Sequence, residues 1–114
     1  MSAIDVDETG TLTAADTVVA MNVTGMGGIA VQVKSTYSGT ITFEGSVDGI
    51  TFVAMILTPI GTTVGATTTT GTGIWRGCVV GLHLFRARMS AYTSGAAIVS
   101  MRGVVSSPTL INLT

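Results

Sequence analysis

Residues 40 to 57 read TITFEGSVDGITFVAMIL, and this stretch decides the fold class. The dipeptide Asp48-Gly49 is typical of two-residue type I′ turns, so the stretch predicts a β-hairpin. The expected pairs are Val47 with Ile50, Gly45 with Phe52, Phe43 with Ala54, and Ile41 with Ile56. One face of this hairpin is uniformly apolar, which is the pattern of a strand pair that covers a core.

The second face of the hairpin is unusual because its two strands differ in polarity. The first strand carries Thr40, Thr42, Glu44 and Ser46 there, whereas the second carries Val53, Met55 and Leu57. A sandwich that exists as a monomer exposes polar residues on its outer face. We therefore expect Val53, Met55 and Leu57 to be buried, either by another part of the chain or by another copy of it.

The length and charge of the chain indicate one domain that is suited to an assembly. Its 114 residues are enough for a single core. Charged residues make up 10% of the chain and the net charge is -1, against about 25% charged residues in an average domain. Such a surface offers little electrostatic resistance to association. The five basic residues are too few and too scattered to predict nucleic-acid binding.

The sequence predicts neither a secretory signal, nor a membrane-spanning helix, nor an intrachain disulfide. The N-terminal MSAIDVDETG is acidic and lacks the basic start and apolar run of a secretory signal. No run approaches the roughly 18 apolar residues of a membrane-spanning helix, so we expect no membrane association. The single cysteine, Cys78, excludes an intrachain disulfide, which fits synthesis in a reducing cytoplasm. We expect Cys78 to be an inert core residue.

Short strands separated by Gly-rich turns extend along the whole chain. They are expected at residues 9–14, 17–23, 29–36, 40–47, 50–57, 62–70, 73–80, 82–91 and 95–105. This spacing, without helical periodicity, predicts an all-β fold, an antiparallel β-sandwich of jelly-roll type with about eight strands. We expect the sandwich domain to span residues 11–105, with extended arms at residues 1–10 and 106–114.

A second hairpin is expected from Leu82 to Val105. The residues expected to point inward are Phe85, Ala87 and Met89 on its first strand, and Ala97, Val99 and Met101 on its second. Both sets point inward if a three-residue loop, Thr93-Ser94-Gly95, places Gly95 in the left-handed conformation.

This register creates a stripe of arginines on the outer face. Arg86 is expected opposite Arg102, and Arg88 joins them. Like charges opposite each other are destabilising, so an anion is expected nearby. The stripe is either a solvated polar face or a surface that meets an acidic group of a neighbouring subunit, where Arg is favoured over Lys.

The sequence predicts no enzyme, cofactor or metal site. His83 is the only histidine and has no carboxylate at local spacing, so we expect it to be structural. Glu44 and Asp48 could form a carboxylate pair, but a turn role for Asp48 and an outer-face position for Glu44 explain them better. The cluster Asp5, Asp7 and Glu8 could bind calcium; a solvated terminal arm is the favoured interpretation.

The only tryptophan, Trp75, has two interpretations. Its alternation with Gly77 and Val79 favours packing between the two sheets. As an exposed aromatic residue it could instead stack on a sugar.

Three segments carry a family resemblance: TITFEGSVDGITFVAM (40 to 55), GIWRGCVVGLHLFRARMSAYTSG (73 to 95) and AAIVSMRGV (96 to 104). Together they resemble small β-sandwich structural proteins of tailed bacteriophages, the head decoration or cement proteins and related tail-associated modules. The resemblance implies a trimer that sits on an icosahedral shell and clamps neighbouring capsomers. The turn from Ser46 to Phe52 is also similar to discoidin-type carbohydrate-binding domains, which usually have Trp where this chain has Phe52.

The leading hypothesis is a capsid decoration protein, a non-enzymatic homotrimer on the capsid surface of a virion, made in the host cytoplasm. Its expected partner is the major capsid protein. The expected interface residues are Val53, Met55, Leu57, Arg86, Arg88 and Arg102, with the arms reaching to the capsid. The alternative is a tail or fibre module that binds a host-surface glycan, with Trp75, Tyr37 or Tyr92 as stacking platforms.

Overall fold

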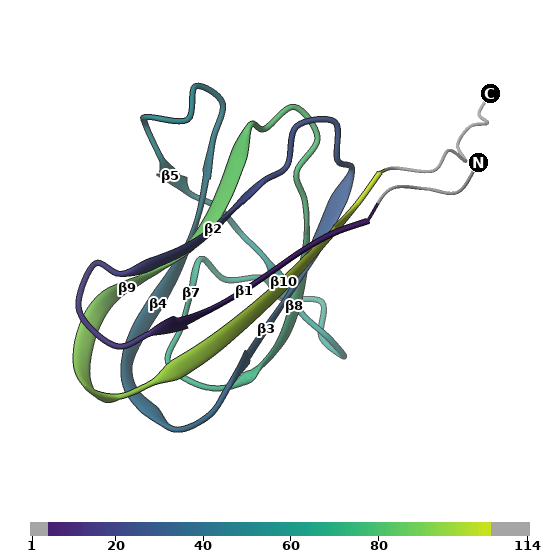
Figure 1. The fold of residues 1–114 in the computed structure, drawn as a ribbon. Helices are drawn as coiled ribbons and strands as arrows, with labels where there is room; N and C mark the ends of the chain where they lie inside the picture. Colours follow the sequence, from purple (N-terminus) through teal and green to yellow (C-terminus); the bar gives the residue numbers. More distant parts are fainter. Residues whose placement is uncertain (1–4, 106–114) are drawn as a thin grey trace.

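The computed structural model describes residues 5–105, which form two antiparallel β-sheets packed face to face (Figure 1). The first sheet has the order β1 (Asp5–Leu12), β10 (Ala97–Val104), β3 (Gly28–Lys34), β8 (Gly73–Cys78) and β6 (Thr58–Pro59). The second has the order β2 (Val18–Asn22), β9 (Leu84–Gly95), β4 (Tyr37–Ser46) and β5 (Val53–Ala54), and β7 (Thr68–Thr69) also pairs with β4. The predicted all-β sandwich is confirmed.

The connections between strands make the sandwich a jelly roll. Only β4 and β5 follow one another within a sheet; every other pair of consecutive described strands is divided between the two sheets. Strands that are neighbours in the sequence therefore face each other across the core, and hydrogen-bonded neighbours are distant in sequence. This arrangement decides which outward side chains share a surface.

Strand β1 shortens the expected N-terminal arm. The prediction assigned residues 1–10 to an arm, but β1 pairs with β10 from Asp5 opposite Val104 to Leu12 opposite Ala97. Leu12 is fully buried, while Asp7, Glu8 and Thr9 are exposed. An edge strand with so few inward apolar residues carries no alternating pattern, so its sequence looks like a solvated arm. Residues 1–4 and the arm expected at 106–114 lie outside the described residues.

The core confirms the predicted inward residues of β9 and β10. Phe85, Ala87 and Met89 on β9 are fully buried, as are Ala97 and Val99 on β10, and Met101 is nearly so. Trp75 is 6% exposed, and its ring centroid lies 5.5 Å from that of Phe43 at an interplanar angle of 52°. Trp75 is therefore a core residue, and the apolar interior is continuous between the sheets.

The predicted pairing of β9 with β10 is wrong, because the chain changes sheets between them. Gly95 does have the predicted left-handed conformation, with φ of 82°. It ends β9, and the next amide, of Ala96, donates to the Thr36 carbonyl at 3.1 Å. A side chain at Gly95 would collide with the Thr36 backbone. The glycine is thus required at a corner between sheets, where the sequence predicted a hairpin loop.

The hairpin of residues 40 to 57 also differs from its prediction. Strand β5 pairs Ala54 with Glu44 and Val53 with Gly45, one residue away from the expected register. In place of a two-residue turn, residues 47–52 form a longer loop around Asp48. The Oδ1 atom of Asp48 accepts hydrogen bonds from Ser46 Oγ at 3.0 Å and from the amides of Ile50 and Thr51 at 2.8 Å. Positive φ occurs at Gly49 and not at Asp48.

Candidate functional site

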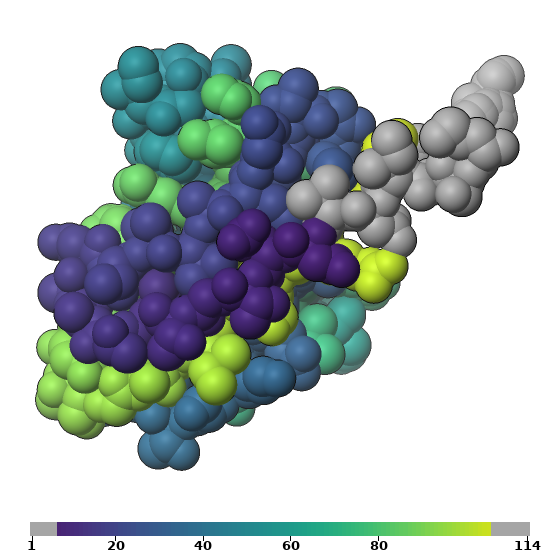
Figure 2. Space-filling model, viewed as in Figure 1, coloured from purple at the N-terminus to yellow at the C-terminus, as the bar shows by residue number. Residues whose placement is uncertain are grey.

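One end of the sandwich exposes aliphatic side chains on two loops. Val47 and Ile50, on the β4–β5 loop, are 72% and 84% exposed, Val53 beside them is 66% exposed, and Val80, on the β8–β9 loop, is 68% exposed. We call these four residues, with the half-buried Met55 and Leu82, the apolar end. Figure 2 shows the β4–β5 loop in teal protruding at the upper left, with green atoms of the β8–β9 loop beside it.

Two open depressions hollow the apolar end. One, of about 450 Å³, lies beside Val47 and Val53, and the other, of about 250 Å³, lies beside Val53, Met55 and Val80. Both include Gly45 and Leu82. A Cβ at Gly45 would lie 2.8 Å from Leu82 Cδ1 and 3.0 Å from Met55 Sδ, so the missing side chain lets these two residues pack over the β4 backbone. The depressions have a largely apolar lining that suits inserted aliphatic side chains.

The three apolar residues predicted to share an outer face are separated by the structure. Val53 is exposed, Met55 is half-buried, and Leu57 is 0% exposed. The register change of one residue turns these alternate residues together toward the inner face, which accounts for the burial of Leu57, whereas Val53 stays exposed next to the β4–β5 loop. Leu57 fills the space that Gly77 leaves on β8, where any Cβ would overlap Leu57 Cδ2. The prediction that Leu57 lies on an outer surface is therefore wrong, whereas Val53 is exposed and can contact another molecule.

The outer face of the second sheet holds a compact ion cluster around Glu44. Glu44 Oε1 accepts from Arg86 Nε at 2.7 Å, and its Oε2 accepts from Arg88 Nη2 at 3.0 Å. Arg88 Nη1 also donates to Asp16 Oδ1 at 2.9 Å. The anion expected near Arg86 and Arg88 is confirmed, and it belongs to the same chain. Both arginines are thus neutralised without an acidic group from another subunit.

Burial and neighbouring charge act in opposite directions on Glu44, whose side chain is 8% exposed. Burial raises the pKa of Glu44, but hydrogen bonds and positive charge from Arg88 and Arg86 outweigh it and hold the pKa below its usual value.

The Arg86 guanidinium also lies 3.7 Å from the ring centroid of Phe52. This contact connects the ion cluster to the loop that carries Val47 and Ile50.

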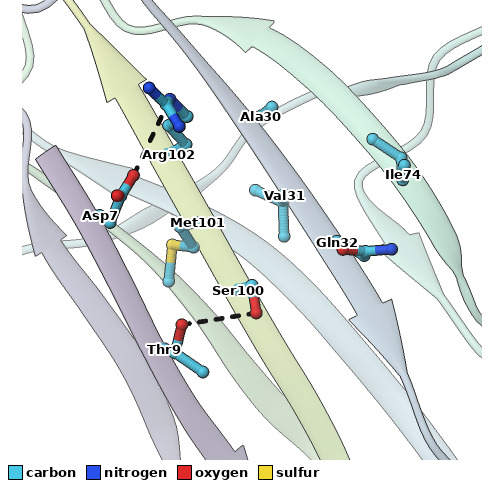
Figure 3. Close-up of a pocket in the computed structure, with 9 residues that line it drawn as sticks. All are labelled: Asp7, Thr9, Ala30, Val31, Gln32, Ile74, Ser100, Met101 and Arg102. Carbon is cyan, nitrogen blue, oxygen red and sulfur yellow. Dashed lines mark hydrogen bonds and ion pairs between the residues drawn. The ribbon is translucent and has the colours of Figure 1, made fainter. Parts of the chain in front are cut away.

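Arg102 lies on the opposite face of the molecule, so the predicted stripe of three arginines is wrong. It projects from β10 on the first sheet, where its Nε is 3.9 Å from Asp7 Oδ1 (Figure 3). An open depression of about 380 Å³ lies beside it, over Ala30, Gln32 and Ser100. The stripe depended on a β9–β10 hairpin, and because the two strands are in different sheets their outward faces point in opposite directions.

The described residues offer no cluster of metal-ligating side chains. Within residues 5–105, no group of three or more His, Cys, Asp or Glu side chains could hold a metal ion. Glu44 accepts hydrogen bonds from arginines, and Asp48 accepts them from loop amides. The two carboxylates therefore have different partners and do not form a pair. Backbone hydrogen bonds from Thr51 and Ile50 lower the pKa of Asp48 to about 2. His83 is exposed, and its backbone amide donates to the Ser46 carbonyl at 2.8 Å.

The aromatic residues suggested for glycan stacking are engaged in the fold. Trp75 is buried, and the half-buried Tyr37 and Tyr92 pack against the core. Tyr37 Oη donates to the Gly71 carbonyl at 2.7 Å, and Tyr92 Oη donates to the Gly95 carbonyl at 2.9 Å. Trp75 cannot offer a ring face to a sugar in this conformation, and the other two rings are partly covered.

Four exposed residues were not predicted to be exposed or to lie at an interface: Cys78, Val47, Ile50 and Val80. Cys78 is exposed, contrary to its predicted core position, because Trp75 and Gly77 take the inward positions of β8. Val47, Ile50 and Val80 were not among the expected interface residues. The available signal was the presence of bulky aliphatics at the ends of strands beside turns, where polar residues usually occur.

Comparisons with known proteins identify the fold. No family model matches the chain, and no curated protein matches it. The solved structure of the SPBc2 prophage-derived protein YomS is similar, with a TM-score of 0.73, 16% identity, and coverage of 91% of this chain and 97% of that one. The PBSX exported protein XepA is also similar, with a TM-score of 0.71 and 17% identity over 89% of this chain, which spans 39% of XepA. Among the described residues, no helix could cross a membrane.

Proposed function

We propose that this protein is a non-enzymatic structural component of a phage particle that attaches to other protein subunits through its apolar end. The observation that carries the proposal is a group of four exposed aliphatic residues: Val47 and Ile50 on the β4–β5 loop, Val53 at the start of β5, and Val80 on the β8–β9 loop. Contiguous exposed apolar surface on a soluble protein is typical of an interaction site.

The physical basis of attachment is removal of this apolar surface from water. Burial contributes about 25 cal/mol per Å² of apolar area. The β4–β5 loop is held in place within the chain, because its Asp48 accepts three hydrogen bonds and Arg86 stacks on its Phe52. A preorganised loop loses less conformational entropy when it binds, so more of the burial energy appears as affinity.

Two observations support a place in a phage particle. The similarity to the prophage-derived YomS extends along nearly the whole of both chains. The chain has 10% charged residues and a net charge of -1, which limits repulsion between closely packed copies. In its specific form, the proposal is a homotrimeric decoration protein that binds between major capsid protein subunits on the capsid surface. Many copies on one particle would make a modest contact effective through multivalency.

The test compares incorporation of variants into purified particles. Val53→Asp and Val80→Asp place a charge at the apolar end, and we expect each to lower the amount of the chain on particles severalfold. Val64→Asp is the matched control, because Val64 is 76% exposed and lies between β6 and β7. Circular dichroism confirms that each variant is folded. Wild-type incorporation of both apolar-end variants, or absence of the native chain from particles, would contradict the proposal.

A further inference from the structure

The positive charges of the chain are concentrated on one face of the sandwich. Of its five Lys and Arg residues, Arg86 and Arg88 belong to the ion cluster on the second sheet. The other three, Lys34, Arg76 and Arg102, are exposed on the outer face of the first sheet. Of the described acidic side chains only Asp7 lies on that face. Among the described side chains this face therefore carries three cations and one carboxylate, and that carboxylate, Asp7, lies beside Arg102, in a chain whose net charge is -1.

Two of these cations flank a gap in the sheet surface. Arg102 pairs with Ala30, and Ala30 pairs with Arg76, so the three residues form one row across β10, β3 and β8. Neighbouring strands are about 5 Å apart, which places the two arginine backbones about 10 Å from each other. Between them, Gly28, Ala30 and the backbone of Gly77 line an open depression of about 260 Å³. Gly28 and Ala30 lie at outward positions of β3, where their small size leaves room between two long guanidinium side chains.

We propose that the outer face of the first sheet binds an acidic segment of a partner protein, with a carboxylate held between Arg76 and Arg102. The guanidinium group presents a planar fork of donors that matches a carboxylate. The apolar floor at Gly28, Ala30 and Gly77, with Val104 beside it, accommodates an aliphatic side chain next to that carboxylate. Arg is enriched at protein interfaces, where its stem also covers apolar surface.

The charge pattern favours a protein over a nucleic acid. Three cations on this face can neutralise few phosphates, whereas nucleic-acid affinity depends on many such contacts. The depression has an apolar floor and no aromatic side chain on which a base could stack. A site that holds one carboxylate between two arginines, beside an apolar floor, suits a protein segment in which an acidic residue lies next to an aliphatic one. The depression between the two arginines shares no lining residue with the apolar end, so the inference does not depend on the proposed function.

The test uses the full chain and a short capped peptide that alternates Glu and Val. Binding is measured by calorimetry and by chemical-shift changes of backbone amides on β3, β8 and β10. Arg76→Gln and Arg102→Gln are each expected to weaken binding by roughly tenfold, the effect of losing a charged hydrogen-bonded partner. Lys34→Gln is the control, since Lys34 lies two outward positions further along β3, about 13 Å from Ala30. Raising the salt concentration should also weaken binding.

Specific outcomes would overturn this inference. One is failure of the peptide to bind at millimolar concentration. Another is equal weakening by Lys34→Gln and by the arginine variants, which would indicate unspecific attraction to positive charge. Equal or tighter binding of a short single-stranded oligonucleotide at the same shifted amides would favour a nucleic-acid partner instead. Val53→Asp should leave peptide binding unchanged, which separates this inference from the function of the apolar end.

Discussion

Replacement of Gly77 by alanine tests how the chain buries Leu57. A Cβ at position 77 would overlap Leu57 Cδ2 and lie 3.6 Å from the Ile56 carbonyl. Leu57 is fully buried, so it has no free space into which it can move without loss of packing. Overpacking of a core costs about 1–3 kcal/mol, and complete loss of a buried leucine side chain costs about 2–5 kcal/mol.

We therefore expect Gly77→Ala to lower the free energy of unfolding by about 2–4 kcal/mol. For a domain of this size, the melting temperature should fall by about 10 °C or more. Urea denaturation followed by Trp75 fluorescence measures the change, because Trp75 is buried in the core. Gly71→Ala is the matched control, since a Cβ there meets nothing within 4 Å.

A second variant identifies Leu57 as the cause. Leu57→Val removes part of the overlapping side chain, so it should cost less in the Gly77→Ala background than in the wild-type chain. If the free energy of unfolding of Gly77→Ala lies within about 0.5 kcal/mol of that of the Gly71→Ala control, Leu57 does not depend on the space at position 77. The same result would reopen the prediction that Leu57 lies on an outer surface.

Three further changes probe the ion cluster, the β4–β5 loop and the exposed thiol. Glu44→Gln should lower the free energy of unfolding at neutral pH by about 2 kcal/mol, because it removes the carboxylate that the partly buried Arg86 and Arg88 share and leaves Arg88 with Asp16. The folded-state pKa of Glu44 is lowered, so its contribution is present above the unfolded-state pKa and is lost as pH falls through the folded-state pKa; denaturation curves that coincide at neutral pH would contradict this. Asp48→Ala should remove a stabilising effect that is present above about pH 4 and lost as pH falls from the ordinary pKa of 3.8 towards about 2; thermal melts across this range measure the difference, and a constant difference down to pH 2 would be inconsistent with it. Cys78 should react with a water-soluble thiol reagent in the native protein nearly as fast as in the unfolded chain, and protection of the native thiol would show that it is buried.

Local periodicity predicted which residues point inward. The alternation of Phe85, Ala87 and Met89 identified the buried side of β9, and a left-handed Gly95 was also expected. These features depend on side-chain period and backbone sterics, which act within a few residues. They hold whether the next strand lies in the same sheet or in the opposite one.

The choice of partner strand could not be predicted in the same way. A jelly roll pairs strands that are distant in sequence, and the alternation of β9 and β10 is the same in a hairpin and across the core. The position of Arg102 and the contact of Glu44 with Arg86 both follow from this choice. The burial of Leu57 likewise depends on the space left by Gly77, which is twenty residues away in the chain. No local sequence pattern connects the two residues.

Attachment through the apolar end can be observed in a cryo-electron microscopy map of particles that carry this chain. We expect Val47, Ile50, Val53 and Val80 to lie within about 4.5 Å of apolar side chains from a neighbouring subunit. A well-resolved sandwich whose apolar end faces solvent at every site on the particle would show that this end is not the attachment surface.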